Sequence, residues 1–226
     1  MKNNPFFLML AATSALLGAL LVISLPAQKE LGNDFKLTGL ESNGEIDASA
    51  KTAYFHGQSL PVPILIEVVS RKSWNQVLGE ESDSKWIEVD LSEQKIRAWD
   101  GNNLFLESLV STGLPGTPTP TGEFRIWTKL RATKMEGGEG KHYYYLPNVP
   151  YVMFFQNDWL PGRKGFSLHG TYWHSDFGNR RSHGCVNLPT PIAEQLYYWV
   201  SPVLPEGKKS IAAASDNPGT RIVIHE

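Results

Sequence analysis

Hydrophobic and polar positions divide this chain into two regions. An uncharged, largely apolar run covers the twenty residues Phe6–Leu25 and follows Lys2. Roughly 20 apolar residues cross a bilayer, whereas the core of a cleavable signal usually has about 7–15. Leu25 is also bulkier than the small residue favoured three positions before a cleavage site at Ala27. We expect residues 1–27 to be a signal peptide or a membrane anchor, with the anchor favoured, and the remainder to be exported.

From about Lys85 the pattern changes to short segments in which apolar and polar residues alternate, as in half-buried strands. One later segment, Pro191–Val200, has the apolar spacing of a helix. Short strands with one late helix predict a mostly β domain, a β-sandwich or open barrel. The predicted strands are Trp86–Leu91, Lys95–Trp99, Leu104–Thr112, Phe124–Lys129, Tyr143–Leu146, Tyr151–Phe155, Phe166–Leu168 and Arg221–Ile224.

The remaining segments are interpreted as connections. Residues 28–84 are mixed and polar, and we expect a spacer with one short ordered segment, Val62–Val69. Gly113–Gly122 is rich in proline and glycine and predicts an ordered loop. Glu136–Gly140 is expected to be a flexible tip, and the stretch from Val200 to Gly219 a surface excursion. Residues 85–226 would then form the main domain.

Composition limits the partners of this domain. The 226 residues carry a net charge of −2, so nothing favours a nucleic-acid partner. Arg180-Arg181 is the only local basic cluster. It is usually a solvated face, but it leaves open a contact to an anionic substrate group or a lower pKa for the neighbouring thiol.

Cys185 is the only cysteine. A lone cysteine is more often a small buried hydrophobe than a nucleophile. An exported protein with one cysteine has no intramolecular disulfide, and its thiol is a candidate reactive group. The flanks, Ser182-His183-Gly184-Cys185-Val186-Asn187, are small and polar and suit an exposed turn better than a core.

Acyl transfer by this thiol needs a base and an oxyanion site. His169 follows a predicted strand sixteen residues before the cysteine, which gives it a rigid mount. No aspartate follows it, so a backbone carbonyl such as that of Gly170 would have to orient the ring. The amides of His183 and Gly184 could together hold a carbonyl oxygen.

Three stretches of the sequence resemble the L,D-transpeptidase (YkuD-type) catalytic domain of bacterial cell-wall enzymes. The first is the His169-Gly170-Thr171 to Asn187 signature, and the second is Ile87–Gln94. The third joins Ser111-Thr112-Gly113 to the Thr117–Phe124 segment. The resemblance covers about residues 85–224.

The resemblance implies roles for the matching residues. Cys185 would be the nucleophile, His169 the base and the Gly170 carbonyl its orienting acceptor. His183 would shape the turn and supply an oxyanion amide, with its ring as base the lesser possibility. The implied turn-fixing or substrate-contacting residues and the cleft wall are Ser182, Asn187, Trp173 and Tyr172. Arg181 is a further candidate for substrate contact, because it lies beside the motif. Core packing is an equal alternative for Trp173.

The family's reaction implies peptidoglycan as partner. The thiolate would attack the third residue of a stem tetrapeptide, expel the terminal D-alanine and form a thioester. An amine of a neighbouring stem would then give a 3→3 cross-link. Water as acceptor would make the protein an L,D-carboxypeptidase, and a protein amine would make it an anchoring enzyme. No cofactor is implied, and carbapenems are expected to acylate the thiol.

Other classes of protein stay open. His169, His174, His183 and Cys185 are ligand types that zinc accepts, but their spacing matches no common zinc motif. His174 is otherwise expected on a surface loop. A non-catalytic cell-wall-binding protein would be expected to lose the Cys/His pair, and another cysteine-protease fold would lack the Thr117–Phe124 stretch.

Two further histidines have weaker contexts. His56-Gly57 repeats the later His-Gly pair without its surroundings, and we interpret it as a loop. Lys141–Tyr145 is polar and aromatic. It predicts either a lid at the border of the substrate cleft or a β-hairpin with aromatic cross-strand pairs.

Overall fold

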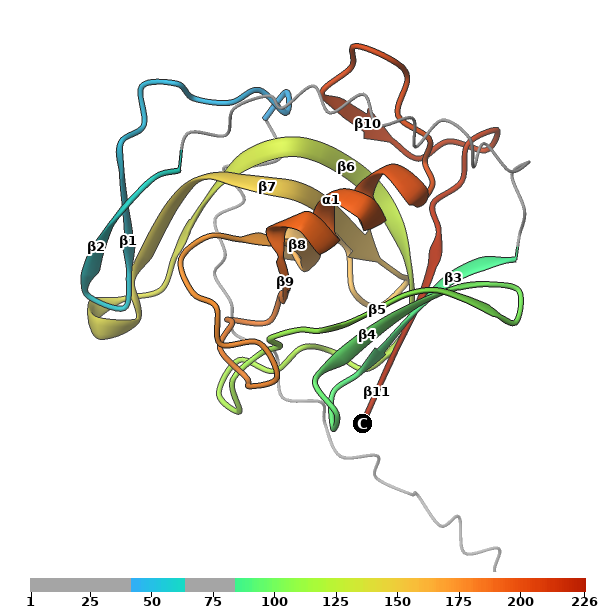
Figure 1. Ribbon diagram of the computed structural model, residues 1–226, viewed down its shortest axis with the longest axis horizontal. Helices are drawn as coiled ribbons and strands as arrows, with labels where there is room; N and C mark the ends of the chain where they lie inside the picture. The colour runs from blue at the N-terminus through green and yellow to red at the C-terminus, as the bar shows by residue number, and fades with distance from the viewer. Residues whose placement is uncertain (1–41, 64–83) are drawn as a thin grey trace, which may run out of the picture. The chain divides into compact units, whose positions relative to one another are not determined.

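The computed structural model describes residues 42–63 and 84–226, and one sheet joins almost all of its elements (Figure 1). Along the main path the strand order is β2-β1-β7-β6-β11-β3-β4-β5, with β8, β9 and β10 attached to its side. The mostly β prediction with one late helix is confirmed for the described residues. The elements on the main path are β1 (Thr52–Phe55), β2 (Gln58–Pro61), β3 (Lys85–Asp90), β4 (Lys95–Asp100), β5 (Asn103–Leu109), β6 (Gly122–Gly137), β7 (Tyr144–Gln156) and β11 (Arg221–His225). The others are η2 (Gly140–His142), η3 (Gly162–Lys164), β8 (Ser167–Thr171), β9 (Val186–Pro189), α1 (Thr190–Trp199) and β10 (Ser210–Ala212).

Alternation sets the register of the strands around the main core. In β3, Ile87 and Val89 are buried while their neighbours are half-buried, and Ile222 and Ile224 of β11 follow the same rule. β11 pairs in parallel with β3, Ile222 beside Ile87. A slip of one residue would turn these apolar side chains away from the core, so the pattern fixes the pairing.

β6 and β7 form the long ribbon of the sheet and differ from the prediction. β6 has 16 residues and β7 has 13, whereas the sequence predicts a short Phe124–Lys129 strand and two separate strands in place of β7. Eleven positions of β7 are buried, because packed side chains cover both of its faces, and alternation is therefore lost. Pro150 does not end the strand; it lies opposite Ala132 of β6. Glu136 and Gly137 of the expected flexible tip belong to β6.

Helix α1 packs on the main core, as its apolar spacing predicts. Ala193, Leu196 and Tyr197 are fully buried, three and four residues apart on one face. Pro191 stands in the first turn, where its missing N–H leaves no helical bond unmade. The helix lies between β9 and the excursion that follows it. That excursion is not wholly irregular, since β10 pairs with β6.

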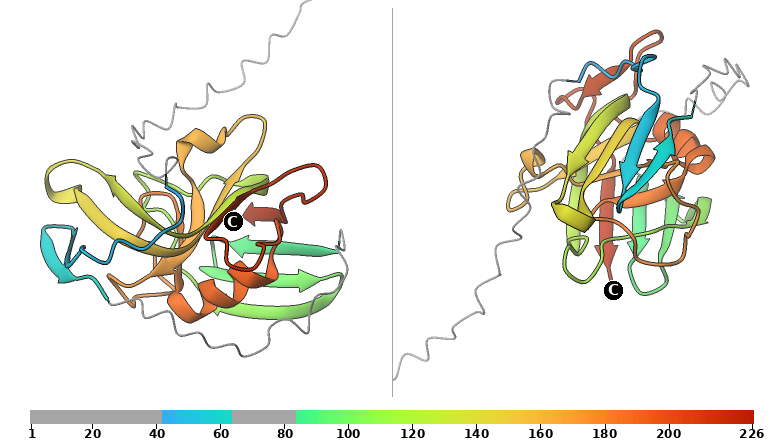
Figure 2. Two further views of the ribbon diagram at one scale, coloured as in Figure 1. Left: turned by 90° about the horizontal axis from the view of Figure 1, so that it is seen from above. Right: turned by 90° about the vertical axis from the view of Figure 1, so that its left-hand side faces the viewer.

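The hairpin of β1 and β2 extends the sheet at the far end from β3, β4 and β5 (Figure 2). It lies within the stretch interpreted as a spacer and pairs with β7 through Tyr54 and Phe55. Asn148 also holds Asp47 by two hydrogen bonds of 2.8 and 2.9 Å. The predicted ordered segment Val62–Val69 falls mainly outside the described residues, as does the apolar N-terminal run. Within residues 42–63 and 84–226, no helix is long and apolar enough to cross a membrane.

Candidate active site

The cysteine motif is a tight turn held by its own serine. Ser182 Oγ donates to the Cys185 carbonyl and accepts the Gly184 amide at 3.0 Å. Gly184 has φ of 122°, and a Cβ there would stand 2.6 Å from the ring of Phe166. Only glycine fits both constraints. The Gly184 amide would therefore have to leave Ser182 to serve the predicted oxyanion role.

The proline- and glycine-rich loop Gly113–Gly122 supports this turn through hydrogen bonds. Thr119 Oγ1 donates to the Gly184 carbonyl at 2.8 Å and accepts the Gly113 amide at 2.9 Å. The Thr112 carbonyl accepts the amides of Arg181 and Ser182 at 2.9 and 3.0 Å. The cysteine motif and the Ser111–Phe124 stretch, two of the three segments that carry the resemblance, are thus joined by hydrogen bonds into one unit.

Strand pairing brings cysteine and histidine to one face. β8 runs parallel to β9, with Leu168 beside Val186 and His169 beside Asn187. Side chains alternate along a strand, so Ser167 and His169 share a face, and Cys185, just before β9, points toward the same side. Ser167 Oγ lies 3.5 Å from Cys185 Sγ.

His169 is a buried, neutral imidazole with a fixed tautomer. It lies inside β8 rather than at the end of a strand, and only 1% of its surface is exposed. Nδ1 is 3.0 Å from the Gly170 carbonyl, which can only accept, so Nδ1 carries the proton and Nε2 has the lone pair. Burial lowers its pKa to about 4, against the raising effect of the Gly170 bond. Gly170 itself is confined, since a Cβ would stand 2.9 Å from Pro150.

The Cys185 thiol is neutral in this arrangement. Burial raises its pKa, and the hydrogen bonds of Ser167 offset this only in part. Sγ also lies 3.7 Å from the Gly165 carbonyl, and no hydrogen bond within the described residues joins it to His169. A neutral thiol therefore faces the same cavity as a neutral imidazole whose Nε2 can take a proton.

Both groups line a narrow cavity of about 40 Å³. The predicted residues Ser182, His183, Asn187 and Trp173 line it as well. A volume of this size holds only a few water molecules, so we expect part of the wall to move when a peptide enters. The other lining residues are Phe55, Met135, Tyr144, Leu146, Lys164, Gly165 and Phe166.

The Asn187 side chain is held by His174, a residue that the sequence predicts on a surface loop. Asn187 Nδ2 lies 2.9 Å from His174 Nε2 and donates to it, while the backbone of Asn187 exchanges two hydrogen bonds with Ser111. His174 is in a loop, but it is half-buried against Phe177 and not on the surface, and burial lowers its pKa to about 4. The predicted turn-fixing role of Asn187 has a structural basis in these contacts.

The remaining predicted substrate residues are placed differently. Trp173 is 9% exposed and packs 5.7 Å from the His169 ring, so it is both core and cavity wall. Tyr172 and Arg181 are not among the described residues that line the cavity. The Tyr172 hydroxyl donates to the Pro147 carbonyl at 2.6 Å, and Arg181 pairs with Asp176.

The sequence did not predict the part of the wall that comes from the hairpin, and for the start of β7 it predicted a border of the cleft as one of two alternatives. Phe55 and Tyr144, paired across β1 and β7, both line the cavity. Tyr144 lies with its ring 4.9 Å from that of His183. The Lys141–Tyr145 segment was a usable signal for this border, whereas nothing around Phe55 marks it in the sequence.

Comparison with known proteins identifies the domain. Residues 84–224 match the family model described as the L,D-transpeptidase catalytic domain, YkuD. The chain belongs to this family. Its sequence is similar to that of YciB of Bacillus subtilis (strain 168), named as a candidate L,D-transpeptidase. The two are 29% identical over 142 residues, which are 59% of this chain and 70% of that protein.

Solved structures of L,D-transpeptidases are similar to this chain. An L,D-transpeptidase from Mycobacterium smegmatis has a TM-score of 0.50 at 20% identity, over 63% of this chain and 59% of that one. A mutant L,D-transpeptidase from Enterococcus faecium has a TM-score of 0.48 at 25% identity, over 63% of this chain and 50% of that one. The YkuD-family chain described here therefore spans about half to three fifths of the length of these structures.

Proposed function

We propose that this chain is a cysteine-dependent L,D-transpeptidase that forms 3→3 cross-links in peptidoglycan. The observation that carries the proposal is that His169 and Cys185 line the same cavity within a YkuD-family domain. The Gly170 carbonyl holds His169 Nδ1–H at 3.0 Å and leaves Nε2 to act as the base. We extend the proposal to an exported protein, anchored through residues 1–27 and acting on stem peptides in the cell envelope.

In the first half-reaction Cys185 Sγ attacks the carbonyl of the third stem residue and gives its proton to His169 Nε2. The oxyanion develops near the motif turn, where the His183 amide and, after release from Ser182, the Gly184 amide are the candidate donors. Collapse breaks the C–N bond, and His169 returns the proton to the amine of the departing D-alanine. The product is a thioester on Cys185.

In the second half-reaction an amine attacks the thioester carbonyl. His169 takes a proton from that amine and returns it to the departing sulfur, which restores the thiol. A stem-peptide amine gives the cross-link, water gives a shortened stem, and a protein amine gives an anchored protein. The resting thiol has a raised pKa, so proton transfer to His169 has to accompany attack by the sulfur.

Mass spectrometry of the purified protein with a disaccharide-tetrapeptide tests this proposal. We expect an adduct on Cys185 that lacks the terminal D-alanine, followed by a cross-linked dimer. A tripeptide product without a dimer would establish the L,D-carboxypeptidase instead. If neither the stem peptide nor a carbapenem forms an adduct with Cys185, the thiol mechanism is wrong. If activity instead requires stoichiometric zinc, a metal site is favoured.

His169→Ala tests the base separately from the nucleophile. We expect the acylation rate to fall by about 10²–10⁴, the usual contribution of a general base. His225→Ala is the matched control, because His225 is a half-exposed histidine of β11 that is bonded to Glu88, and β7 and β6 separate β11 from β8. Equal acylation rates in the two variants would remove His169 from the mechanism.

A further inference from the structure

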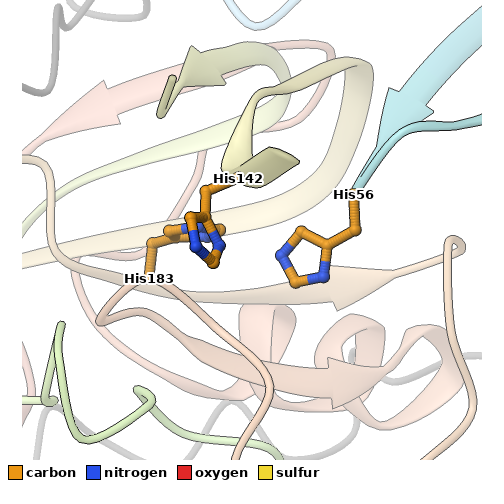
Figure 3. A group of neighbouring side chains, drawn as sticks. All are labelled: His56, His142 and His183. Atoms are coloured by element: carbon orange, nitrogen blue, oxygen red, sulfur yellow. The ribbon is translucent and has the colours of Figure 1, made fainter. Parts of the chain in front are cut away.

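Three histidines from separate parts of the chain point toward one another (Figure 3). One of them, His183, lines the Cys185 cavity. His56 is in the turn between β1 and β2, His142 ends η2 between β6 and β7, and His183 belongs to the cysteine motif. One ring nitrogen of each lies within 4.8 Å of those of the other two. We call these residues the histidine cluster. It differs from the His169, His174, His183 and Cys185 set that the sequence suggests for zinc.

The three imidazole rings lie edge-on to one another and are not stacked, and their ring nitrogens come close together. Their centroids are 5.5 to 6.4 Å apart and their planes are 77° to 87° to one another. Zinc binds imidazole nitrogen at about 2.0–2.1 Å, which in a tetrahedral site brings the ligand nitrogens to about 3.3 Å from each other. The nitrogens would therefore have to approach by about 1–1.5 Å to reach that tetrahedral spacing. Side-chain rotation of the exposed His142 and a small shift of the hairpin would supply such a movement.

One feature of His56 is explained neither by packing nor by its turn. Its φ of 48° and the φ of 77° at Gly57 are what a two-residue hairpin turn requires, and histidine enters the left-handed region more readily than most residues. Its Nε2, however, is buried and has no hydrogen-bond partner among the described residues. A buried ring nitrogen without a partner indicates a function at that position. Stacking on Phe55 at 4.1 Å fixes the ring but leaves the nitrogen unsatisfied.

The electrostatic surroundings allow a cation. Metal ligation requires unprotonated imidazoles. Burial lowers the pKa of His56 and lowers that of His183 to about 4. Of the cations nearby, Arg181 pairs with Asp176, which reduces its repulsion of a metal ion. Lys141 precedes His142 in η2, and Lys164 lines the cavity.

We propose that His56, His142 and His183 bind one Zn²⁺ ion, which closes the mouth of the Cys185 cavity. Three protein ligands leave the fourth zinc position to water. Each ligand is close to the cavity wall: Phe55 precedes His56, Tyr144 follows η2, and His183 lines the cavity itself. A bound ion would hold the hairpin, the β6–β7 tip and the motif together, so a peptide could not enter. Control of catalysis in this way rests on the proposed function; metal binding does not.

Calorimetric titration of the untagged full-length protein with Zn²⁺, after treatment with a chelator, tests the site. We expect one ion per chain, and His56→Gln or His142→Gln should weaken binding by at least about tenfold. His225→Gln is the matched control and should bind as the wild type does. Cys185→Ser should also retain the affinity. Unchanged binding in both cluster variants, or loss of binding in Cys185→Ser, would overturn the site.

Alkylation of Cys185 by iodoacetamide tests closure without relying on transpeptidation. Zn²⁺ should slow the alkylation of Cys185 in the wild type, because the closed mouth excludes the reagent, and should leave the alkylation rate of His56→Gln unchanged. Equal slowing in His56→Gln would mean that zinc acts on the thiol directly and would overturn the proposal. Zinc binding with no slowing in the wild type would overturn closure. Neither zinc titration nor alkylation of Cys185 requires transpeptidase activity. Both results would therefore stand even if the proposed function were wrong.

Discussion

At the scale of single residues, burial rather than charge controls the candidate nucleophile. The Arg180-Arg181 pair, which the sequence left open as a means of lowering the thiol pKa, does not do so. Arg181 pairs with Asp176, and Arg180 contacts Glu226 at 3.3 Å. Burial instead raises the pKa of Cys185, opposed by the hydrogen bonds of Ser167. The free protein therefore holds a protected thiol.

The pH dependence of alkylation follows from this protection. In the presence of a chelator, the alkylation rate of Cys185 should still be rising above pH 9, because the thiolate forms only above a raised pKa. Ser167→Ala should move the midpoint to higher pH, since the Ser167 hydroxyl favours the thiolate. Iodoacetamide kinetics between pH 6 and 10 give the midpoint independently of access. A midpoint below that of free cysteine would contradict the protected thiol.

Gly184 is the residue of the motif with the least freedom. Gly184→Ala should lower the free energy of unfolding by about 1–3 kcal/mol, because the new Cβ meets Phe166 and the backbone is left-handed. Gly116→Ala is the matched control. No atom would lie within 4 Å of its Cβ, and its stability should be unchanged or slightly higher. Urea unfolding measures both, and equal stabilities would show that the turn can relax.

At the scale of elements, α1 is tied to β6 by a buried lysine. Lys129 is 1% exposed, and its Nζ donates to the carbonyls of Tyr197 and Val200 at 2.6 and 2.8 Å. These carbonyls belong to the end of the helix, which lacks intrahelical partners for them. Burial lowers the pKa of Lys129 to about 7. The ammonium is thus retained at some cost in order to satisfy the helix end.

This lysine predicts a pH-dependent stability. In the unfolded chain Lys129 titrates near 10.5, so between pH 7 and 10.5 the unfolded state binds more protons than the folded state. Stability from this group therefore rises with pH across that range. The free energy of unfolding of the wild type should increase relative to Lys129→Met from pH 7 to 10. A difference that stays constant in urea titrations would refute the lowered pKa.

Elements were predictable where one face alone is buried. β3, β4 and α1 show a clear apolar period because their other faces are polar or half-exposed. β7 shows none, since its two faces meet two separate groups of buried side chains, and the Pro147–Tyr151 stretch looks like a break. Asn148 and Tyr151 have φ of 55° and 54° and lie between residues of β7 that pair with β6. The strand therefore continues through this irregular stretch because pairing with β6 resumes on either side of each residue.

At the scale of the whole molecule, the β1–β2 hairpin joins the wall of the site from a distant part of the sequence. It buries Ala53 completely in the smaller core group, with Leu130, Val152 and Trp173. Pairing with β7 involves two residues of β1, so the attachment is limited. The hairpin is therefore the part of the cavity wall that we expect to move when a peptide enters.

Ala53→Glu tests this attachment. A carboxylate at a fully buried position of the hairpin should detach β1 and β2 from β7 while the main core stays folded. Hydrogen exchange of the β1–β2 amides should accelerate, β3 and β4 should stay protected, and Cys185 should be alkylated faster. Thr52→Glu, at the exposed neighbouring position, is the matched control and should behave as the wild type. Unchanged alkylation in Ala53→Glu would mean that the hairpin does not limit access.

The sequence by itself determined the mostly β class, the late helix and the Cys185–His169 hypothesis. Local periodicity and short motifs carry those features, and the residues that form them are neighbours along the chain. Tertiary structure alone decided that Thr119 supports Gly184, that Arg181 faces Asp176 and that three histidines point toward one another. These contacts join segments brought together by sheet order, and sheet order depends on the burial of both faces of β7, which no local pattern encodes.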